Sequence, residues 1–246
     1  MTKAMIEVTR LTKRFGDRIA VDHVSFLAKP GEVVGLLGPN GAGKTTTMRM
    51  LTGFLPPSEG GAKIAGHDIA ADSLNARRNV GYLPERVPVY PDMTVREYVF
   101  FWARLRGQRD ARARADAVIA QVNLSERRDT LIRNLSKGMR QRLGFAQALV
   151  HDPPVLILDE PTIGIDPRQV IEVRDTVREL GRTKTVLFST HILSEAEHTC
   201  DRVIILHQGR IVAQGQPSDL KRKLRPDATL EEVFLSIVGA ERGADK

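Results

Sequence analysis

The chain has 246 residues, of which 41% are hydrophobic and 27% charged, and its formal net charge is +7. This is ordinary globular composition, which excludes a disordered or fibrous class and favours one domain with subdomains. No apolar run reaches the ~18 residues of a spanning helix, and Met1 to Arg10 lacks the apolar core of a secretory signal. The single Cys200 cannot form an internal disulfide. We therefore expect a cytoplasmic chain that does not itself cross a bilayer.

The first third of the chain predicts strands and one helix. Residues 5–37 contain short apolar segments broken by turn residues, and residues 33–37 form a continuous apolar strand. A Gly-rich segment follows, and then a helix over about 43–53. Residues 60–68 predict a short strand pair and residues 80–83 a further strand.

The middle of the chain, residues 94–150, has helical periodicity and predicts a helical insertion. Strand signals then return, separated by helical stretches, and a terminal amphipathic helix closes the chain. The strands are expected at 155–158, 185–188 and 203–206, and the helices at 168–180, 193–198 and 230–238. Strands that alternate with helices predict a largely parallel, doubly wound sheet.

The positive charge alone does not choose between a nucleic-acid partner, an anionic membrane surface and solvated helix faces. The basic residues are dispersed, since Arg alternates with Ala and Asp over 104–114 and the basic run 221–223 is brief. We favour solvated helix faces, with membrane proximity ahead of nucleic acid.

Residues 38–45 fit the pattern G-x-x-x-x-G-K-[ST] between a predicted strand and a predicted helix. Glycines let successive backbone N–H groups point inward at a bound phosphate, and the following helix presents its positive end to the same phosphate. An ordinary strand-to-helix turn is the alternative, but the flanking elements favour a phosphate cradle. Its expected nucleotide-binding residues are Gly38, Pro39, Asn40, Gly41, Ala42, Gly43, Lys44, Thr45 and Thr46.

The strand at 155–158 ends in two adjacent carboxylates, Asp159 and Glu160. Asp159 is placed to hold Mg²⁺, together with the Thr45 hydroxyl. Glu160 is expected to point to the other face and to polarise an attacking water. Lys44 is expected to reach the β- and γ-phosphates.

Further motifs in the same order resemble those of ATP-binding-cassette (ABC) proteins, over the range Phe15 to about Val238. Leu135-Ser136-Lys137-Gly138-Met139 is similar to the family signature, whose usual form is Leu-Ser-Gly-Gly-Gln, and Lys137 and Met139 depart from it. Ser136 suits a helix N-cap, which would aim the helix at a phosphate. The resemblance implies that Ser136 and Gly138 bind nucleotide.

Other segments carry the same resemblance. Residues 164–167 look like the loop that communicates across a dimer, and His191 matches the switch histidine that contacts the γ-phosphate. Phe15 stands where the family has an aromatic that stacks on adenine, and a core phenylalanine is the alternative. Glu85 stands where the family has a glutamine, and a carboxylate there can still ligate Mg²⁺ or a bridging water.

The resemblance implies a P-loop NTPase (RecA-like) α/β core with an antiparallel β subdomain and an inserted α-helical subdomain. Residues 1–246 would form one ABC ATPase domain. Residues 1–85 and 150–220 would form the core, 86–149 the helical subdomain with the signature, and 221–246 a C-terminal helical extension.

In functional terms, the resemblance implies an ATP- and Mg²⁺-dependent ATPase that powers a separate membrane-spanning transporter subunit. Catalytic roles would fall to Glu160, His191, Glu85 and Lys44, and Mg²⁺ to Thr45, Asp159 and Glu85. Glu85, the signature and the ending at 230–234 look like the ABC-2 type export branch. One copy of each motif implies a homodimer or a dimer with a related ATPase, bound to integral membrane permeases at the inner face of the cell membrane.

The alternatives are a soluble ABC-type ATPase that acts on nucleic acid or ribosomes, and a small-molecule kinase. The first usually carries two cassettes or a long coiled-coil insertion, and the second needs neither signature nor switch histidine, so we expect no nucleic-acid partner. The aromatic run of Tyr98, Phe100, Phe101 and Trp102 forms either a groove for a partner's short helix or the core of the helical subdomain.

Overall fold

The structure is a computed structural model that describes residues 4–225 and 227–244. Its strands are β1 (Ile6–Phe15), β2 (Arg18–Ala28), β3 (Val33–Leu37), β4 (Glu59–Ile64), β5 (His67–Asp68), β6 (Val80–Leu83), β7 (Val155–Asp159), β8 (Thr185–Thr190), β9 (Arg202–His207) and β10 (Arg210–Gly215). Its α-helices are α1 (Lys44–Leu51), α2 (Ser73–Arg78), α3 (Val95–Leu105), α4 (Ala111–Gln121), α5 (Lys137–Leu149), α6 (Pro167–Gly181), α7 (Leu193–Thr199), α8 (Pro217–Leu224) and α9 (Leu230–Ala244).

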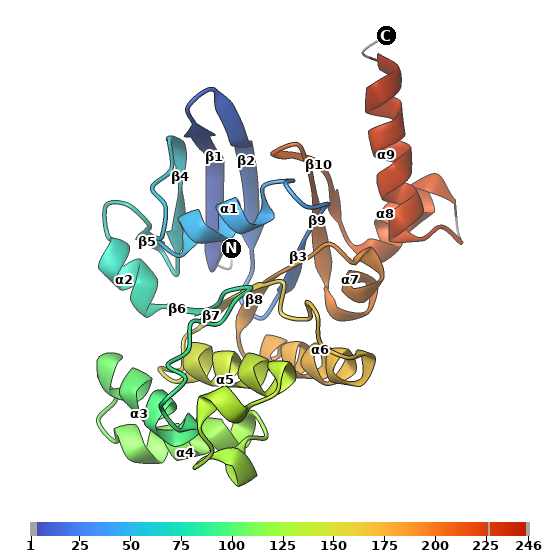
Figure 1. Cartoon of the computed structure of the whole chain (residues 1–246). Coiled ribbons are helices and arrows are strands. Elements are labelled where there is room, and N and C mark those ends of the chain that lie inside the picture. The colour runs from blue at the N-terminus through green and yellow to red at the C-terminus, as the bar shows by residue number, and fades with distance from the viewer. Residues whose placement is uncertain (1–3, 226, 245–246) are drawn as a thin grey trace.

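Two sheets organise these elements (Figure 1). The larger has the strand order β10-β9-β3-β8-β7-β6, and all its pairings are parallel except that of β9 with β10. The smaller is antiparallel, with the order β2-β1-β4-β5. The predicted fold class, a mixed α/β core with an antiparallel β part and a helical insertion, is confirmed.

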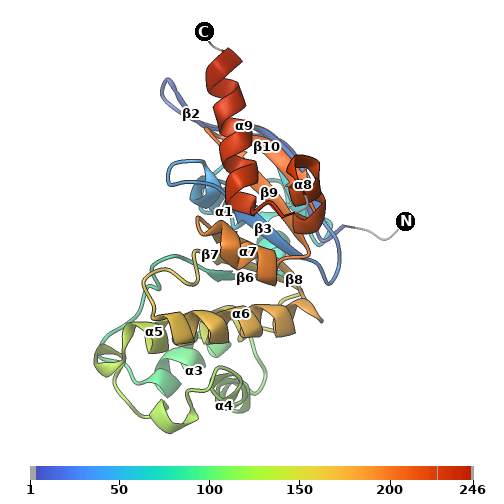
Figure 2. The same cartoon turned by 90° about the vertical axis from the view of Figure 1, so that its right-hand side faces the viewer.

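The two faces of the parallel sheet belong to different hydrophobic clusters, because the side chains of a strand alternate. In β3, Val33 and Leu37 join the cluster of the helical insertion, whereas Val34 and Leu36 join that of the antiparallel sheet and α1. Figure 2 shows the corresponding layers, with α5 and α6 on one side of the sheet and α1 on the other.

The helical insertion contains α3, α4 and α5, as its periodicity predicts. A capping box between Thr94 and Glu97 starts α3, and the Ser136 hydroxyl caps α5 by accepting from the Met139 N–H at 3.2 Å. Tyr98 is fully buried, and its hydroxyl donates to the Pro88 carbonyl at 2.8 Å. This tyrosine therefore ties the loop after β6 to the helical layer.

Three elements, α2, β10 and α8, are absent from the sequence predictions, because none of them contains an apolar run like those of β3 and β7. Helix α8 spans the boundary expected at residue 221, so the C-terminal helical part begins at Pro217. Within the described residues, no helix combines the length and the apolar character that a membrane span requires.

Candidate active site

The loop between β3 and α1 has a backbone shape that only glycine tolerates at two positions. Gly38 has φ +149°, and a Cβ there would lie 2.3 Å from the Leu206 carbonyl oxygen. Gly43 has φ +104°, and a Cβ there would lie 2.6 Å from the Ala20 carbonyl oxygen. The close approach of neighbouring backbone thus fixes the curl of the loop, and α1 begins directly after it at Lys44.

Lys44 and Thr45 bring this loop to the end of β7. The buried Lys44 ammonium donates to the Gly38 carbonyl at 2.7 Å and lies 3.2 Å from Oε1 of Glu160. The Thr45 hydroxyl donates to Oδ1 of Asp159 at 3.2 Å. Consecutive residues of α1 therefore contact the two consecutive carboxylates.

Asp159 is held by β8 as well as by α1. The Ser189 hydroxyl donates to Oδ1 of Asp159 at 2.7 Å and accepts from the Glu160 N–H at 2.9 Å. Burial raises the pKa of Asp159, and hydrogen bonds from Ser189 and Thr45 oppose that rise. Its second oxygen, Oδ2, is buried and has no hydrogen-bond partner in the described part of the chain. That oxygen is free to accept a cation or a donor.

Glu160 does not face away from Asp159, so this expectation is wrong. Strand β7 ends at Asp159, and Glu160 has φ +49°, which breaks the alternation of the strand. The Glu160 carboxylate thereby lies between Lys44 and His191, whose Nδ1 is 2.8 Å from Oε2 of Glu160. The carboxylates of Asp159 and Glu160 therefore face the same side of the site.

A cavity of about 300 Å³, here called the phosphate-loop cavity, lies over these groups. It is lined by Arg18, Ala20, Asn40, Gly41, Ala42, Gly43, Lys44, Thr45, Thr46, Glu85, Glu160 and Ile163. Glu85 reaches it from the loop after β6. Arg18, Ala20 and Ile163 were not predicted, because no motif singles them out. The positioning contacts of Ser189 were not predicted either, although that residue precedes His191 in a motif.

Phe15 and the signature residues lie outside that lining. Phe15 ends β1 with 49% of its surface exposed, which contradicts the alternative of a core phenylalanine, and Lys13 Nζ lies 5.3 Å from its ring centre. Ser136 and Gly138 begin α5. One copy of the chain therefore does not bring its signature to its own phosphate loop.

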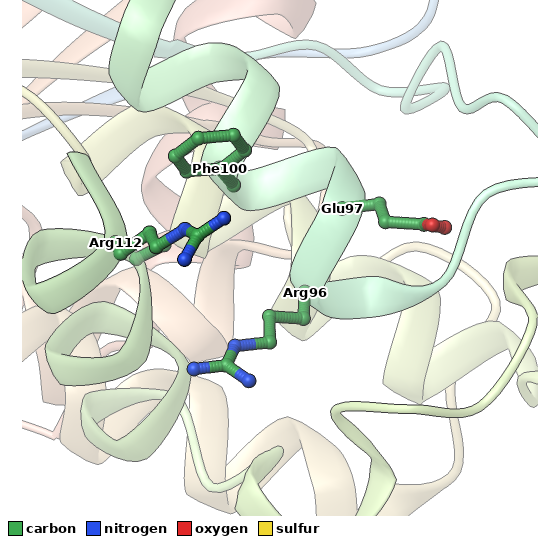
Figure 3. A pocket seen from close by; sticks show the side chains of 5 residues that line it. Arg96, Glu97, Phe100 and Arg112 are labelled. Carbon is green, nitrogen blue, oxygen red and sulfur yellow. The ribbon is translucent and has the colours of Figure 1, made fainter.

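A second cavity, of about 400 Å³, lies between α3 and α4 (Figure 3). Figure 3 shows that Arg96 and Glu97 leave α3 on different sides and that the Arg112 side chain extends toward Phe100. Glu97 caps its own helix. The Arg96 guanidinium pairs with Asp116 at 2.6 Å, and that of Arg112 lies 5.8 Å from the Phe100 ring centre. These arginines contact groups of their own subdomain, as solvated helix faces do.

Comparison with known proteins places this geometry in a family. The model of the family described as "ABC transporter" matches residues 21–163. The chain belongs to the ABC transporter family. It is an ATP-binding and ATP-hydrolysing subunit whose ATPase activity is coupled to transport across a membrane.

Three ABC proteins illustrate the similarity. "Nod factor export ATP-binding protein I" of Paraburkholderia xenovorans is 42% identical over 223 residues, which are 89% of this chain and 73% of that protein. A solved "ATP binding subunit of ABC transporter" is 32% identical with a TM-score of 0.86, over 95% of this chain and 99% of the other. The cassette MJ0796, solved as a dimer bound to ADP and Pi, is 25% identical with a TM-score of 0.77, over 86% and 98%.

Proposed function

We propose that this ABC subunit binds MgATP in the phosphate-loop cavity and that two subunits together power export through a membrane permease. The observation that carries the proposal is the convergence of Lys44, Thr45, Asp159, Glu160 and His191 at the ends of β3, β7 and β8. This set combines a cation for phosphate oxygens, a hydroxyl and a carboxylate for a metal, and a second carboxylate for water.

The residues fit Mg²⁺. Asp159 offers a buried oxygen without a partner, and Thr45 stands beside it. The described residues contain no group of three or more His, Cys, Asp or Glu side chains that could hold a metal. Mg²⁺ in nucleotide sites needs no such group, because it is bound through one or two carboxylates plus phosphates and waters. Asp159 and Thr45 would hold the ion, with Glu85 at the same cavity, and the ion would neutralise charge on the phosphates.

Glu160 is the general base in this proposal. Its carboxylate takes a proton from the attacking water, and His191 fixes its orientation through the 2.8 Å contact. Lys44, held by the Gly38 carbonyl, contacts the β- and γ-phosphates. Phe15, exposed at the end of β1, stacks on adenine.

The site is complete only in a dimer, because Ser136 and Gly138 lie outside their own phosphate-loop cavity. Each signature therefore contacts the nucleotide of a second subunit, either another copy or a related ATPase. The solved cassette dimer with ADP and Pi supports this arrangement. Export as the direction is supported by the name of the Nod factor relative.

A groove of about 460 Å³ between α2, β6 and α3, here called the α2–α3 groove, suits the permease. Phe54, Leu74 and Leu105 line it and are 70%, 55% and 62% exposed. The buried Nε1 of Trp102, another lining residue, has no hydrogen-bond partner within the described ranges. The groove also presents three guanidinium groups, from Arg77, Arg78 and Arg106.

The apolar and basic side chains of the groove favour one partner, a short helix of the permease with an apolar face and at least one carboxylate. Docking there would hold the subunit at the inner face of the cell membrane. The nearby Phe101 does not line the groove, so Phe101→Ala is a matched control for Trp102→Ala. We expect Trp102→Ala to release the subunit from its permease, and Phe101→Ala to retain it, in a co-purification.

The central test is Glu160→Gln, which keeps the shape of the base but removes its charge. With MgATP this variant should bind nucleotide, hydrolyse it at least ~10²-fold more slowly and accumulate as a dimer on light scattering. The added change Lys44→Ala should abolish both binding and dimerisation. A Glu160→Gln chain that stays monomeric with saturating MgATP would exclude the two-subunit site.

A further inference from the structure

The end of α3, the loop after it and the first turns of α4 form a basic segment. Residues 104–114 contain five arginines and one aspartate, a net charge of +4. The aspartate, Asp110, caps α4 by accepting from the Ala113 N–H at 3.0 Å. Arg114 donates to carbonyl oxygens at the end of α5 at 2.7 and 2.9 Å. The other four arginines form no ion pair with the described residues: Arg104, Arg106, Arg109 and Arg112.

Phe100 brings two of these arginines together. The guanidinium carbon of Arg104 lies 6.0 Å from the centre of the Phe100 ring, and that of Arg112 lies 5.8 Å from it. Arg104 belongs to α3 and Arg112 to α4, and both residues are exposed. The ring attracts both cations but has no net charge, so it neutralises neither of them. Two positive charges therefore meet at one ring, and an anion is the missing group.

The 400 Å³ cavity between α3 and α4 lies beside this ring (Figure 3). The charge of Arg96 at the cavity is neutralised by Asp116, and the Glu97 carboxylate accepts from the Thr94 N–H at 2.8 Å. Arg112 is thus the lining cation that has no carboxylate partner in the described part of the chain. With Phe100 as its apolar wall, the cavity fits a ligand that combines an apolar part with an anionic oxygen.

Leu105 adds an exposed apolar side chain to the same place. It stands between Arg104 and Arg106, and 62% of its surface is exposed. Burial, and after it the nearby charge of Arg77, lowers the pKa of Arg106, so positive charges also crowd one another on this side of α3. An exposed leucine among arginines is typical of surfaces that lie in a membrane interface. We call Phe100, Arg104, Leu105, Arg109 and Arg112 the α3–α4 corner.

We propose that the α3–α4 corner binds the head groups of anionic phospholipids. A lipid phosphate lies between the guanidinium groups of Arg104 and Arg112, and Leu105 enters the boundary between head groups and acyl chains. The inference goes beyond the proposed function, because this contact needs neither the permease nor nucleotide. Leu105 also lines the α2–α3 groove, so a permease helix in that groove and lipid at the corner would meet the same turn of α3.

The side chains of the corner favour lipid over nucleic acid. Proteins that bind single strands stack the bases on exposed aromatic rings. Phe100 is only partly exposed and already has two guanidinium groups near its ring, whereas the exposed apolar side chain is a leucine, which cannot stack. An aliphatic side chain instead gains by entering the acyl region of a bilayer.

The test is flotation of the purified chain with vesicles, without permease or nucleotide. One set of vesicles is phosphatidylcholine with one-third phosphatidylglycerol, and the other is phosphatidylcholine alone. The variant is Arg104→Gln with Arg112→Gln. Its matched control is Arg178→Gln with Arg182→Gln, which removes the same charge from two exposed arginines at the end of α6. Urea unfolding and MgATP hydrolysis of both variants should match those of the native chain, because all four residues lie outside the phosphate-loop cavity.

We expect the native chain to bind the anionic vesicles and not those of phosphatidylcholine alone. The corner variant should bind about 30-fold more weakly, since each arginine at an anionic surface contributes about fivefold. The control should change by less than about twofold, because its arginines lie on another element. Trp102, the single tryptophan, lies one turn before Leu105, so energy transfer from it to a dansyl-labelled lipid should accompany binding.

Four outcomes would overturn the inference. Corner and native chains that bind alike would show that the corner does not contact lipid, and an equal loss in the control would show that only net charge acts. Release from vesicles by millimolar glycerol phosphate would assign the corner to a free phosphate compound. Arginine-dependent binding of an RNA oligonucleotide, without vesicle binding, would assign it to nucleic acid.

These results are separable from the proposed function. Failure of vesicle binding leaves the ATPase and the dimer untouched. A Glu160→Gln chain that stays monomeric with MgATP would refute the two-subunit site and leave vesicle binding unchanged.

Discussion

His151 links the stability of the fold to pH. It follows α5, and its Nε2 lies 3.0 Å from the Val80 carbonyl at the start of β6. A carbonyl only accepts, so Nε2 carries the proton, while Nδ1 is buried without a partner among the described residues. Burial, and after it the nearby charge of Arg106, lowers the pKa of His151 from 6.5 to about 4.

The sign of the effect follows from proton binding. The folded pKa is about 4 and the unfolded one 6.5, so the unfolded chain binds more protons between these values. The contribution of the neutral imidazole to stability is complete above the unfolded pKa and is lost as pH falls through this window. Between pH 7 and pH 5 the loss in the free energy of unfolding is roughly 2 kcal/mol.

Urea unfolding at pH 7 and pH 5 tests this, with His151→Gln as the variant. Glutamine keeps a neutral N–H donor for the Val80 carbonyl but does not titrate. The native chain should therefore lose about 2 kcal/mol more than the variant on acidification. His198→Gln, at an exposed histidine, should follow the native chain. Equal losses in the native and His151→Gln chains would refute a buried neutral imidazole.

Three further substitutions test the site and the fold. Ser189→Ala removes the hydroxyl that bonds the Asp159 carboxylate and the Glu160 backbone N–H, so kcat should fall about tenfold or more with little change in ATP affinity from titration. Phe15→Ala should weaken ATP binding about fivefold to tenfold, the worth of one aromatic stacking contact, and unchanged affinity would remove Phe15 from the site. Gly81→Ala should lower the free energy of unfolding by about 2 to 3 kcal/mol, because its Cβ would lie 2.2 Å from a carbonyl oxygen of α5. Gly61 has open space around it, so Gly61→Ala should leave the free energy of unfolding unchanged in the same urea assay.

Local signals were sufficient for the layered fold and the phosphate loop. The apolar run at Val33–Leu37, the glycines after it and the helix from Lys44 are consecutive in sequence, so their pattern predicts the geometry directly. The helical insertion was predictable for the same reason. Element type follows from periodicity, which a single segment carries by itself.

Contacts between distant segments could not be predicted in this way. The direction of Glu160 depends on a positive φ that no residue type at that position announces, so strand alternation gave the wrong face. The Lys137 ammonium lies beside Gly164, which is 27 residues further along the chain. The α2–α3 groove combines side chains of α2, β6, α3 and α5, and the aromatic run contributes only Trp102 to its lining.

The register of the parallel sheet explains why such distant residues still meet with useful geometry. Leu158 pairs with Phe188 and Asp159 with Ser189, and the apolar pair joins the cluster beneath the sheet. A slip of one residue between β7 and β8 would turn Ser189 to the opposite face and would move the apolar side chains of the slipped strand from one cluster to the other. Such a slip costs packing energy, since core side chains of the wrong shape cost about 1 to 3 kcal/mol each. The packing that stabilises the two clusters therefore also holds Ser189 against Asp159, and the catalytic geometry needs no separate constraint at this point.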